Sequence, residues 1–345
     1  MKPPERDPVT DLRRIAFLLE RAHEATYRVR AFRSAAAAVE ALPAEEVRSR
    51  ATAGTLPELP GVGDVTARTV TESLAGELPA YLARLEEASG APVAAGGEAI
   101  RALLRGDCHT HSDWSDGGSP IMEMAAAARA LGHEYVVLTD HSPRLTVANG
   151  LSADRLRAQL EVVAEANAEL APFRILTGIE VDILDDGSLD QETDLLAQLD
   201  IVVASVHSKL RMPSQEMTPR MVAAVANPHV DILGHCTGRN VTSGGRRGRT
   251  RPESEFEADL VFAACEQFGV AVEINCRPER LDPPKRLLRL AVESGCVFSL
   301  DTDAHAPGQL DWQPYGCARA EACAVPTERI VNTWPAETLL SWVAE

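Results

Sequence analysis

Six of the nine histidines share one rule of placement: each stands at or just past the end of a short apolar run. Carboxylates accompany them, because Glu180 closes the segment Thr177-Gly178-Ile179-Glu180, Asp303 lies at the last run together with His305, and Asp116 lies in the loop after the first run. Imidazole and carboxylate together suit zinc, manganese or iron, and nine such ligands are too many for one ion. The pattern predicts a site for several metal ions, built on His109, His111, His141, His207, His235 and His305.

Any one of these histidines, taken alone, would more often be a buried, hydrogen-bonded residue than a ligand. The shared placement of six favours metal binding. His23, His133 and His229 fall outside the pattern and are expected to have structural roles.

Seven apolar runs must carry these side chains, and amphipathic stretches separate the runs. This alternation predicts parallel βα units, and the number of runs favours an α/β barrel over an open sheet. The carboxyl ends of barrel strands converge, so the predicted ligands would meet there. His109 and His111 are two residues apart and would face one side, and Asp303 and His305 repeat that spacing. The predicted strands are Asp107–His111, Tyr135–Asp140, Arg174–Ile183, Ile201–His207, Val230–His235, Val270–Asn275 and Val297–His305.

Residues 8–88 show helical periodicity instead, and Ala35–Val39 is typical of a small-residue helix that ends near Pro43. The uncharged stretch Gly90–Gly97 is typical of a linker. We therefore expect three parts: a helical domain over residues 8–90, a linker over 91–105 and a barrel domain over 106–345.

The motif Leu59-Pro60-Gly61-Val62-Gly63 before a predicted helix is typical of a helix-hairpin-helix. Gly61 and Gly63 would allow a tight turn that directs backbone N–H groups and a helix N-terminus at a DNA phosphate. Such binding is independent of base sequence. The chain has a net charge of −17, which repels nucleic acid as a whole. A local contact through backbone N–H groups is compatible with this charge.

The composition excludes several other classes of protein. With 45% apolar and 25% charged residues the chain is globular rather than disordered. No apolar run approaches the roughly 18 residues of a membrane span, and the first residues have no signal-peptide pattern. Seven scattered cysteines without a C-x-x-C pair argue against a disulfide framework. We expect a soluble cytoplasmic protein with no membrane contact.

From Asp107 onward the chain resembles the PHP (polymerase and histidinol phosphatase) superfamily, through His109-Thr110-His111-Ser112, Thr139-Asp140-His141, Gly178-Ile179-Glu180, Ser205-Val206-His207, Gly234-His235 and Asp303-Ala304-His305. The resemblance implies a distorted seven-stranded (βα)7 barrel with three divalent ions, which are manganese, zinc, iron or magnesium in the superfamily. It implies that His109, His111, Glu180 and Asp303 bind one ion. Glu180, His207 and His235 would bind a second, and Asp116, His141 and His305 the third.

Close-set divalent ions activate a bound water and clamp the oxygens of a phosphoryl group. The expected reaction is hydrolysis of a phosphoester by a metal-bound hydroxide, with no catalytic side chain beyond the ligands. Cationic side chains near the strand ends would hold the phosphate, and the candidates are Lys209, Arg239 and Arg280. A basic loop carrying Arg246, Arg247 and Arg249 would contact a phosphate backbone. The alternative for each of these residues is a surface ion pair or a solvated side chain.

Residues 10–88, including Tyr27–Ala36, resemble the N-terminal DNA-binding domain of family X DNA polymerases, whose bacterial members carry a PHP domain at the C-terminus. Arg28, Arg30 and Arg33 are the predicted backbone contacts. Only about fifteen residues separate the two parts here, which leaves no room for a polymerase catalytic domain. Lyase activity needs a Schiff-base lysine. Lys2 is the one lysine among the first hundred residues, so we do not expect lyase activity.

We therefore expect a metal-dependent phosphoesterase that acts on DNA 3′ ends or gaps in repair, as a 3′–5′ exonuclease, a 3′-phosphatase or both. A polymerase or ligase is an expected partner in trans. One alternative is a small-molecule phosphatase for histidinol phosphate or a nucleotide. The other is a non-catalytic DNA-binding scaffold, against which the complete ligand set argues.

Overall fold

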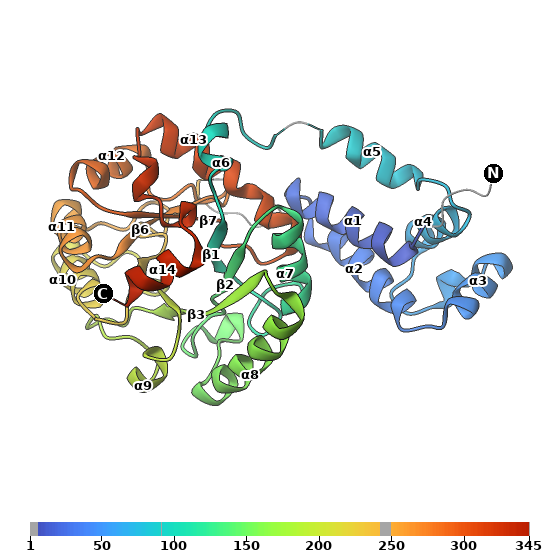
Figure 1. Cartoon of the computed structure of the whole chain (residues 1–345), viewed down its shortest axis with the longest axis horizontal. Helices are drawn as coiled ribbons and strands as arrows, with labels where there is room; N and C mark the ends of the chain where they lie inside the picture. Colours follow the sequence, from blue (N-terminus) through green and yellow to red (C-terminus); the bar gives the residue numbers. More distant parts are fainter. Residues whose placement is uncertain (1–5, 91, 242–249, 345) are drawn as a thin grey trace. The chain divides into compact units, whose positions relative to one another are not determined.

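The computed structural model describes residues 6–90, 92–241 and 250–344. The chain divides into two compact units, Met1–Val93 and Ala94–Glu345 (Figure 1). Among the described residues, no helix has both the length and the apolar character that a membrane crossing requires.

In the part of the first unit that the structure describes, all regular elements are helices, and its core is formed by Leu12, Ile15 and Leu19 of the first helix against Phe32 and Val70. The first helix begins at Pro8 because the Asp7 carboxylate accepts hydrogen bonds from the next free backbone amides. Its elements are α1 (Pro8–Arg21), α2 (Thr26–Glu40), α3 (Ala44–Ala53), the 3₁₀ turn η1 (Leu56–Glu58), α4 (Asp64–Leu74) and α5 (Ala80–Ala88).

A tight turn joins η1 to α4. Gly61 has φ +86°, and a Cβ there would lie 3.1 Å from the Cβ of Ser34 on α2, so the turn requires glycine at this position. Gly63 is the N-cap of α4, and its N–H donates to Thr66 Oγ1 over 2.9 Å. A Cβ at Gly63 would meet nothing within 4 Å.

The second unit contains seven parallel strands in the order β1 to β7. A bridge between Thr110 and Ala304 joins the end of β1 to the segment after β7, and this nearly closes the sheet. The pairing of β1 with β2 is irregular between Asp107 and Thr110, which distorts the barrel. The predicted barrel is confirmed, with strands β1 (Gly106–Thr110), β2 (Tyr135–Leu138), β3 (Arg174–Asp182), β4 (Ile201–Ser205), β5 (Ile232–Leu233), β6 (Ala271–Asn275) and β7 (Phe298–Asp301).

Helices surround the strands and cover their outer face (Figure 1). The largest core cluster packs strand residues such as Ile179 and Val272 against Met221, Phe262 and Leu288 of the helices. The helices of this unit are α6 (Glu98–Arg101), α7 (Ile121–Ala130), α8 (Ala153–Leu170), α9 (Thr193–Leu196), α10 (Ser214–Val225), α11 (Ala258–Phe268), α12 (Lys285–Glu293), α13 (Gln313–Ala322) and α14 (Ala336–Val343), with 3₁₀ turns η2 (Thr146–Ala148), η3 (Pro307–Trp312), η4 (Thr327–Arg329) and η5 (Val331–Thr333).

The segment predicted as a linker over residues 91–105 contains helix α6. Gly97 precedes it with φ +77°, and its N–H donates to Glu321 Oε2 over 3.0 Å. A Cβ at Gly97 would lie 2.3 Å from the backbone of Cys317 on α13. The second half of this segment is therefore anchored to the barrel unit, because its backbone packs directly on α13.

Candidate metal centre

All nine predicted ligands lie at the carboxyl ends of the barrel strands, within the described residues. His109 lies inside β1 and Glu180 inside β3, whereas the others follow strands directly or lie in the loop after β1. His109, His111, Glu180, His235 and Asp303 are almost completely buried. The Asp116 side chain is 38% exposed, the largest fraction in the set.

Glu180 lies at the centre of the cluster. Its Oε1 is 2.9 Å from His235 Nε2 and 3.2 Å from His207 Nε2. Its Oε2 is 2.8 Å from His141 Nδ1 and 3.3 Å from His109 Nε2. Two ligand atoms that each lie about 2.1 Å from one ion are separated by about 3.0–3.4 Å at tetrahedral or octahedral angles. These separations are close to the spacing that a shared ion requires.

A second set of short distances lies beside the first. Asp116 Oδ1 is 3.3 Å from His305 Nε2 and 3.6 Å from His141 Nε2. His111 Nε2 is 3.5 Å from Asp303 Oδ1. Each of three groups has ligand atoms within 4.8 Å of one another: His111, Asp116, His141 and His305; His109, His111 and Asp303; and His141, Glu180 and His207.

The two nitrogens of His141 face different carboxylates, Asp116 on one side and Glu180 on the other. This histidine therefore lies between the second and third groups that the resemblance implies.

The last strand is shorter than predicted, since β7 ends at Asp301 and Asp303 has φ +52°. Asp303 and His305 thus reach the cluster from the segment that follows β7, in which Asp303 has a left-handed backbone.

Several atoms of the cluster are buried without a hydrogen-bond partner, namely His109 Nε2, both ring nitrogens of His111 and His207, His141 Nδ1, His235 Nδ1 and Glu180 Oε2. Buried polar groups in proteins are nearly always paired, so this concentration needs an explanation. Divalent ions would supply the missing partners, because imidazole and carboxylate are their ordinary ligands. The residues fit a metal centre.

The pKa values of the cluster residues are shifted by burial and by the charges of neighbouring cluster residues. Burial opposes the ionisation of Glu180, but His109, His141 and His207 hold its pKa well below the usual value. Burial likewise opposes protonation of His207, but the Glu180 and Asp182 carboxylates raise its pKa to about 9. Burial, together with His305 and His141, lowers the pKa of His111 well below its ordinary value. The lowered pKa keeps the Glu180 carboxylate in the ionised form that metal binding requires.

Three residues that contact the cluster were not predicted from the sequence. The Glu273 carboxylate accepts a hydrogen bond from His109 Nδ1 over 2.6 Å, and Asp182 Oδ1 accepts one from the backbone N–H of His207 over 3.1 Å. Arg277 donates to the carbonyl of Asp303 over 2.7 Å, and its guanidinium lies over the ring of Trp312. A charged residue inside an apolar run was the available signal for Glu273.

Of the three predicted phosphate contacts, the structure brings Arg280 to the cluster, with its Nε 3.2 Å from Asp303 Oδ2. Lys209 forms a 2.5 Å ion pair with Asp185, and its side chain is 62% exposed.

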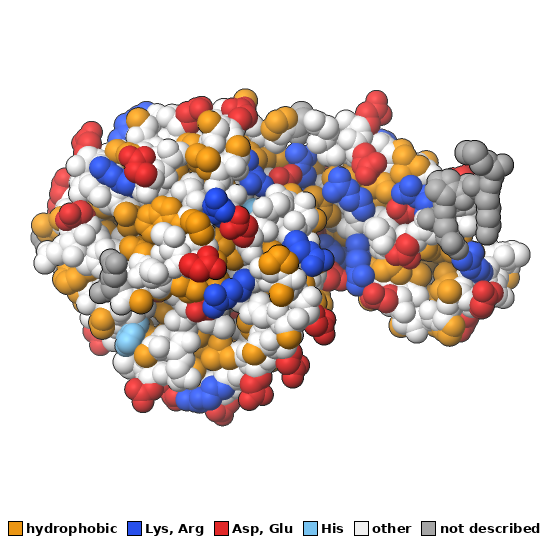
Figure 2. Space-filling view, in the orientation of Figure 1, with side chains coloured by type: hydrophobic (Ala, Val, Ile, Leu, Met, Phe, Trp, Pro, Cys, Tyr) orange, Lys and Arg blue, Asp and Glu red, His pale blue; other side chains and the backbone are white. Residues whose placement is uncertain are grey.

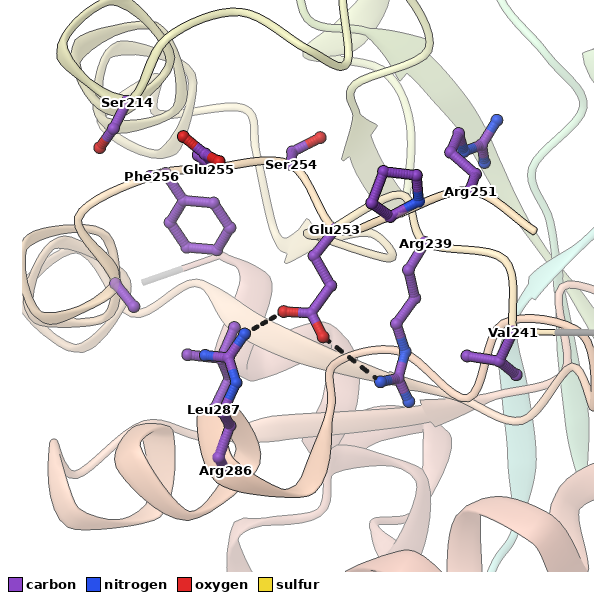
Figure 3. A pocket seen from close by; sticks show the side chains of 12 residues that line it. Ser214, Arg239, Val241, Arg251, Glu253, Ser254, Glu255, Phe256, Arg286 and Leu287 are labelled. Carbon is purple, nitrogen blue, oxygen red and sulfur yellow. Dashed lines mark hydrogen bonds and ion pairs between the residues drawn. The ribbon is translucent and has the colours of Figure 1, made fainter.

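Arg239 points instead into a separate pocket of about 670 Å³. Figure 3 shows its guanidinium directed at Glu253, which also pairs with Arg286. Its Nε donates to the carbonyl of Arg280 over 3.0 Å. Arg239 thereby supports the backbone that presents Arg280. The predicted DNA contacts Arg246, Arg247 and Arg249 lie outside the described residues.

In the helical unit, the three predicted arginines have different surroundings. Arg33 forms a two-point ion pair with Glu20, over 2.9 and 3.0 Å, and its side chain is only 15% exposed. Arg28 donates to Tyr81 Oη over 2.6 Å and pairs with Glu24, whereas Arg30 is exposed. Gly61 and Gly63 are also exposed. Figure 2 shows basic side chains interspersed with acidic ones on the face drawn.

Comparison with known proteins identifies both units. Residues 3–77 match the family model of the helix-hairpin-helix domain, and residues 107–275 match that of the PHP domain. The DNA polymerase/3′-5′ exonuclease PolX of Bacillus subtilis (strain 168) is 41% identical over 229 residues, which are 66% of this chain but 39% of that protein. A probable phosphatase of Thermoanaerobacter sp. (strain X514) is 30% identical over 210 residues, 58% of this chain and 78% of that protein.

A crystal structure of histidinol phosphate phosphatase from Lactococcus lactis subsp. lactis Il1403, in complex with zinc, L-histidinol and phosphate, aligns with 64% of this chain and 92% of its own. The sequence identity is 19% and the TM-score is 0.47.

Proposed function

The chain belongs to the PHP domain family and is a metal-dependent phosphoesterase, and from this premise we propose that it hydrolyses phosphoesters at DNA 3′ ends in repair, as a 3′–5′ exonuclease, a 3′-phosphatase or both. The observation that carries the proposal is the clustering of histidine and carboxylate side chains at the strand ends in a chain that also has a helix-hairpin-helix domain. The similarity to PolX, whose name includes a 3′-5′ exonuclease, supports it. The chain spans about two fifths of PolX, so the substrate is part of the proposal.

The proposed ligands are the nine residues predicted from the sequence, arranged for three divalent ions. Bound there, the ions would activate a water and neutralise the oxygens of the phosphoryl group. Glu180 can bridge two ions, because its two oxygens face different pairs of histidines. Manganese, zinc, iron and magnesium remain the candidate metals.

Two arginines of the chain have the position to hold the phosphate. Arg277 and Arg280 both follow β6 and lie against Asp303, with side chains 19% and 22% exposed. A guanidinium can give two parallel hydrogen bonds to phosphate oxygens, which fixes the scissile bond relative to the cluster. The helical unit would bind the duplex through the Gly61–Gly63 turn and Arg30, independent of base sequence.

The test is digestion of a 5′-labelled recessed duplex, and of a nicked duplex with a 3′ phosphate, by the full chain with manganese. His109→Ala is the inactive control. Stepwise shortening or loss of the 3′ phosphate, absent with His109→Ala, is the expected result. DNA that stays intact while the metal is bound would reject the proposal.

A second candidate is a small-molecule phosphatase, favoured by the probable phosphatase that this chain covers over 78% of its length. Histidinol phosphate and a nucleotide monophosphate, assayed in parallel, distinguish the two. Free phosphate from either one, with DNA untouched, would place the protein among small-molecule phosphatases. A polymerase or ligase that works on the same DNA end is the proposed partner, and co-purification from cells tests it.

A further inference from the structure

Strand β6 contributes none of the nine proposed ligands, although it lies between β5 and β7 in the sheet. Two of its residues, Glu273 and Asn275, are nevertheless completely buried polar side chains. They are two apart in a strand and therefore point to the same face. Polar residues at fully buried strand positions are costly unless they are well paired.

The partners of these residues are the proposed ligands of other strands. Glu273 Oε1 lies 2.6 Å from His109 Nδ1, and Glu273 Oε2 accepts a 2.5 Å hydrogen bond from the backbone N–H of His235. Asn275 Nδ2 donates to Glu273 Oε2 over 3.2 Å and to Asp303 Oδ2 over 3.3 Å. Through two side chains, β6 holds ligands that come from β1, from the end of β5 and from the turn after β7.

The contact with His109 determines which ring nitrogen carries the proton. A carboxylate oxygen at this distance favours an N–H on Nδ1, and in a neutral imidazole with that proton on Nδ1 the lone pair of Nε2 is free. That Nε2 lies 3.3 Å from Glu180 Oε2, on the side of the proposed ions. A histidine can bind a metal only through a nitrogen that carries no proton.

We propose that Glu273 is a positioning residue of the metal centre, which fixes the tautomer and orientation of His109 and the backbone of His235. It touches neither ion nor substrate and acts through these two ligands. The inference rests on the proposed function, because it presupposes that the cluster binds metal.

The geometry also explains why a glutamine would not replace Glu273. With its oxygen toward His109, a glutamine would turn its NH₂ group toward the N–H of His235 and the NH₂ of Asn275, so that donors face donors. With its NH₂ toward His109, the imidazole would have to move its proton to Nε2, where the ion should bind. Both orientations weaken the site, although the shape of the side chain is retained.

The experiment uses the full chain and Co²⁺, whose visible absorption reports its ligands. We compare wild type, Glu273→Gln and the matched control Asp231→Asn, which makes the same carboxylate-to-amide change beside the neighbouring strand β5. Asp231 accepts a hydrogen bond from the N–H of Val202 over 2.7 Å. It directly precedes β5 and so lies at the amino end of that strand, whereas the proposed ligands lie at the carboxyl ends. Titration gives the affinity, and elemental analysis gives the number of ions per chain.

We expect Glu273→Gln to bind Co²⁺ about 10–100-fold more weakly, as is usual when the partner of a ligating histidine is lost, with a changed absorption band. Asp231→Asn should bind as wild type does. Equal affinity and an identical band for Glu273→Gln would overturn the inference while leaving the phosphoesterase intact. A wild type that binds no metal would instead reject the proposed function.

If Glu273→Gln does not fold, as judged by its tryptophan fluorescence, Glu273→Asp takes its place. Aspartate keeps the charge but is one methylene shorter, so its carboxylate withdraws from His109 Nδ1. We expect the same direction of change. Unaltered Co²⁺ binding by a folded Glu273→Asp would overturn the inference.

Discussion

Glu180 shows how much of the proposed chemistry depends on one side chain. Its carboxylate contacts histidines contributed by four strands, which come from widely separated parts of the sequence. Its burial would be unfavourable without them, since an isolated buried carboxylate would take up a proton. Glutamine in its place would keep one oxygen only, and aspartate would keep both oxygens but is one methylene shorter, so neither would reach all four histidines in the same way.

Arg280 and Lys209 differ in their expected effect on turnover. Arg280→Ala should lower kcat/KM for a DNA 3′ phosphate about 100-fold, because a donor preorganised at the cluster is lost. Lys209→Ala should change it by less than about threefold, because this side chain is mostly exposed and paired with Asp185. Steady-state kinetics of the two variants and wild type, at equal metal content, measures both effects. A large effect of Lys209→Ala with none of Arg280→Ala would contradict the assignment.

His133 provides a pH-dependent contribution to stability. It is buried, and its Nε2 lies 3.0 Å from Gln313 Oε1 on α13. Burial, together with the charge of Arg101, lowers the pKa of His133 to about 4. The unfolded chain, with an ordinary value near 6.5, binds the proton first, so this contribution is complete above about pH 6.5 and is lost as the pH falls toward about 4.

His133→Gln should therefore make the barrel less sensitive to acid. The free energy of unfolding should drop between pH 7.5 and pH 5 by about 2 kcal/mol less in the variant than in wild type. Urea denaturation followed by tryptophan fluorescence measures it, because all four tryptophans lie in the barrel unit: Trp114, Trp312, Trp334 and Trp342. The same drop in both proteins would contradict the role of His133.

At the level of secondary structure, the two glycines of the turn before α4 allow the proposed DNA binding to be tested separately from folding. Gly61→Ala forces φ +86° on a residue with a Cβ and presses on Ser34, so the helical unit should lose about 1–2 kcal/mol of stability. Gly63→Ala should cost less, about 0.5–1 kcal/mol, because its Cβ meets nothing within 4 Å and the loss is only that alanine is a poorer N-cap than glycine. The new methyl group would still obstruct a phosphate at the start of α4.

Far-UV circular dichroism on urea titration gives the stabilities, and fluorescence anisotropy with a labelled duplex gives the affinities. We expect Gly63→Ala to bind DNA several-fold more weakly than wild type while folding normally. Unchanged DNA binding by this variant would exclude the turn as a DNA contact.

The strands could be predicted because their apolar runs are bounded by loops, and the candidate ligands because they stand at the ends of those runs. The residues that hold these ligands in place, such as Glu273, could not be predicted. His109 and Glu273 are 164 positions apart, and their contact exists only once β1 and β6 have found their places in the barrel. Arg239 failed to reach the cluster for a similar reason, since the pairing with Glu253 and the carbonyl of Arg280 is decided by tertiary packing.

On the scale of the whole molecule, the two units should respond differently to loss of metal. The cluster belongs to the barrel unit, and ions bind it only when it is folded. Dialysis against a chelator should lower the Tm of the tryptophan-monitored transition by roughly 5–10 °C. The helical unit, followed by circular dichroism, should keep its Tm. Equal shifts of both transitions would contradict a metal site confined to the barrel.

A bridge joins Thr110 to Ala304, and the N–H of His111 donates a hydrogen bond to the carbonyl of Ala304. The cluster can therefore form only when the first strand and the segment after the last strand of the barrel have come together. A chain that emerges from the ribosome delivers His109 and His111 long before Asp303 and His305. Two of the three ligand groups need residues from both ends of this unit. Nascent or truncated chains that lack Asp303 and His305 therefore cannot form these two groups, and we expect phosphoesterase activity only after synthesis has passed the last strand.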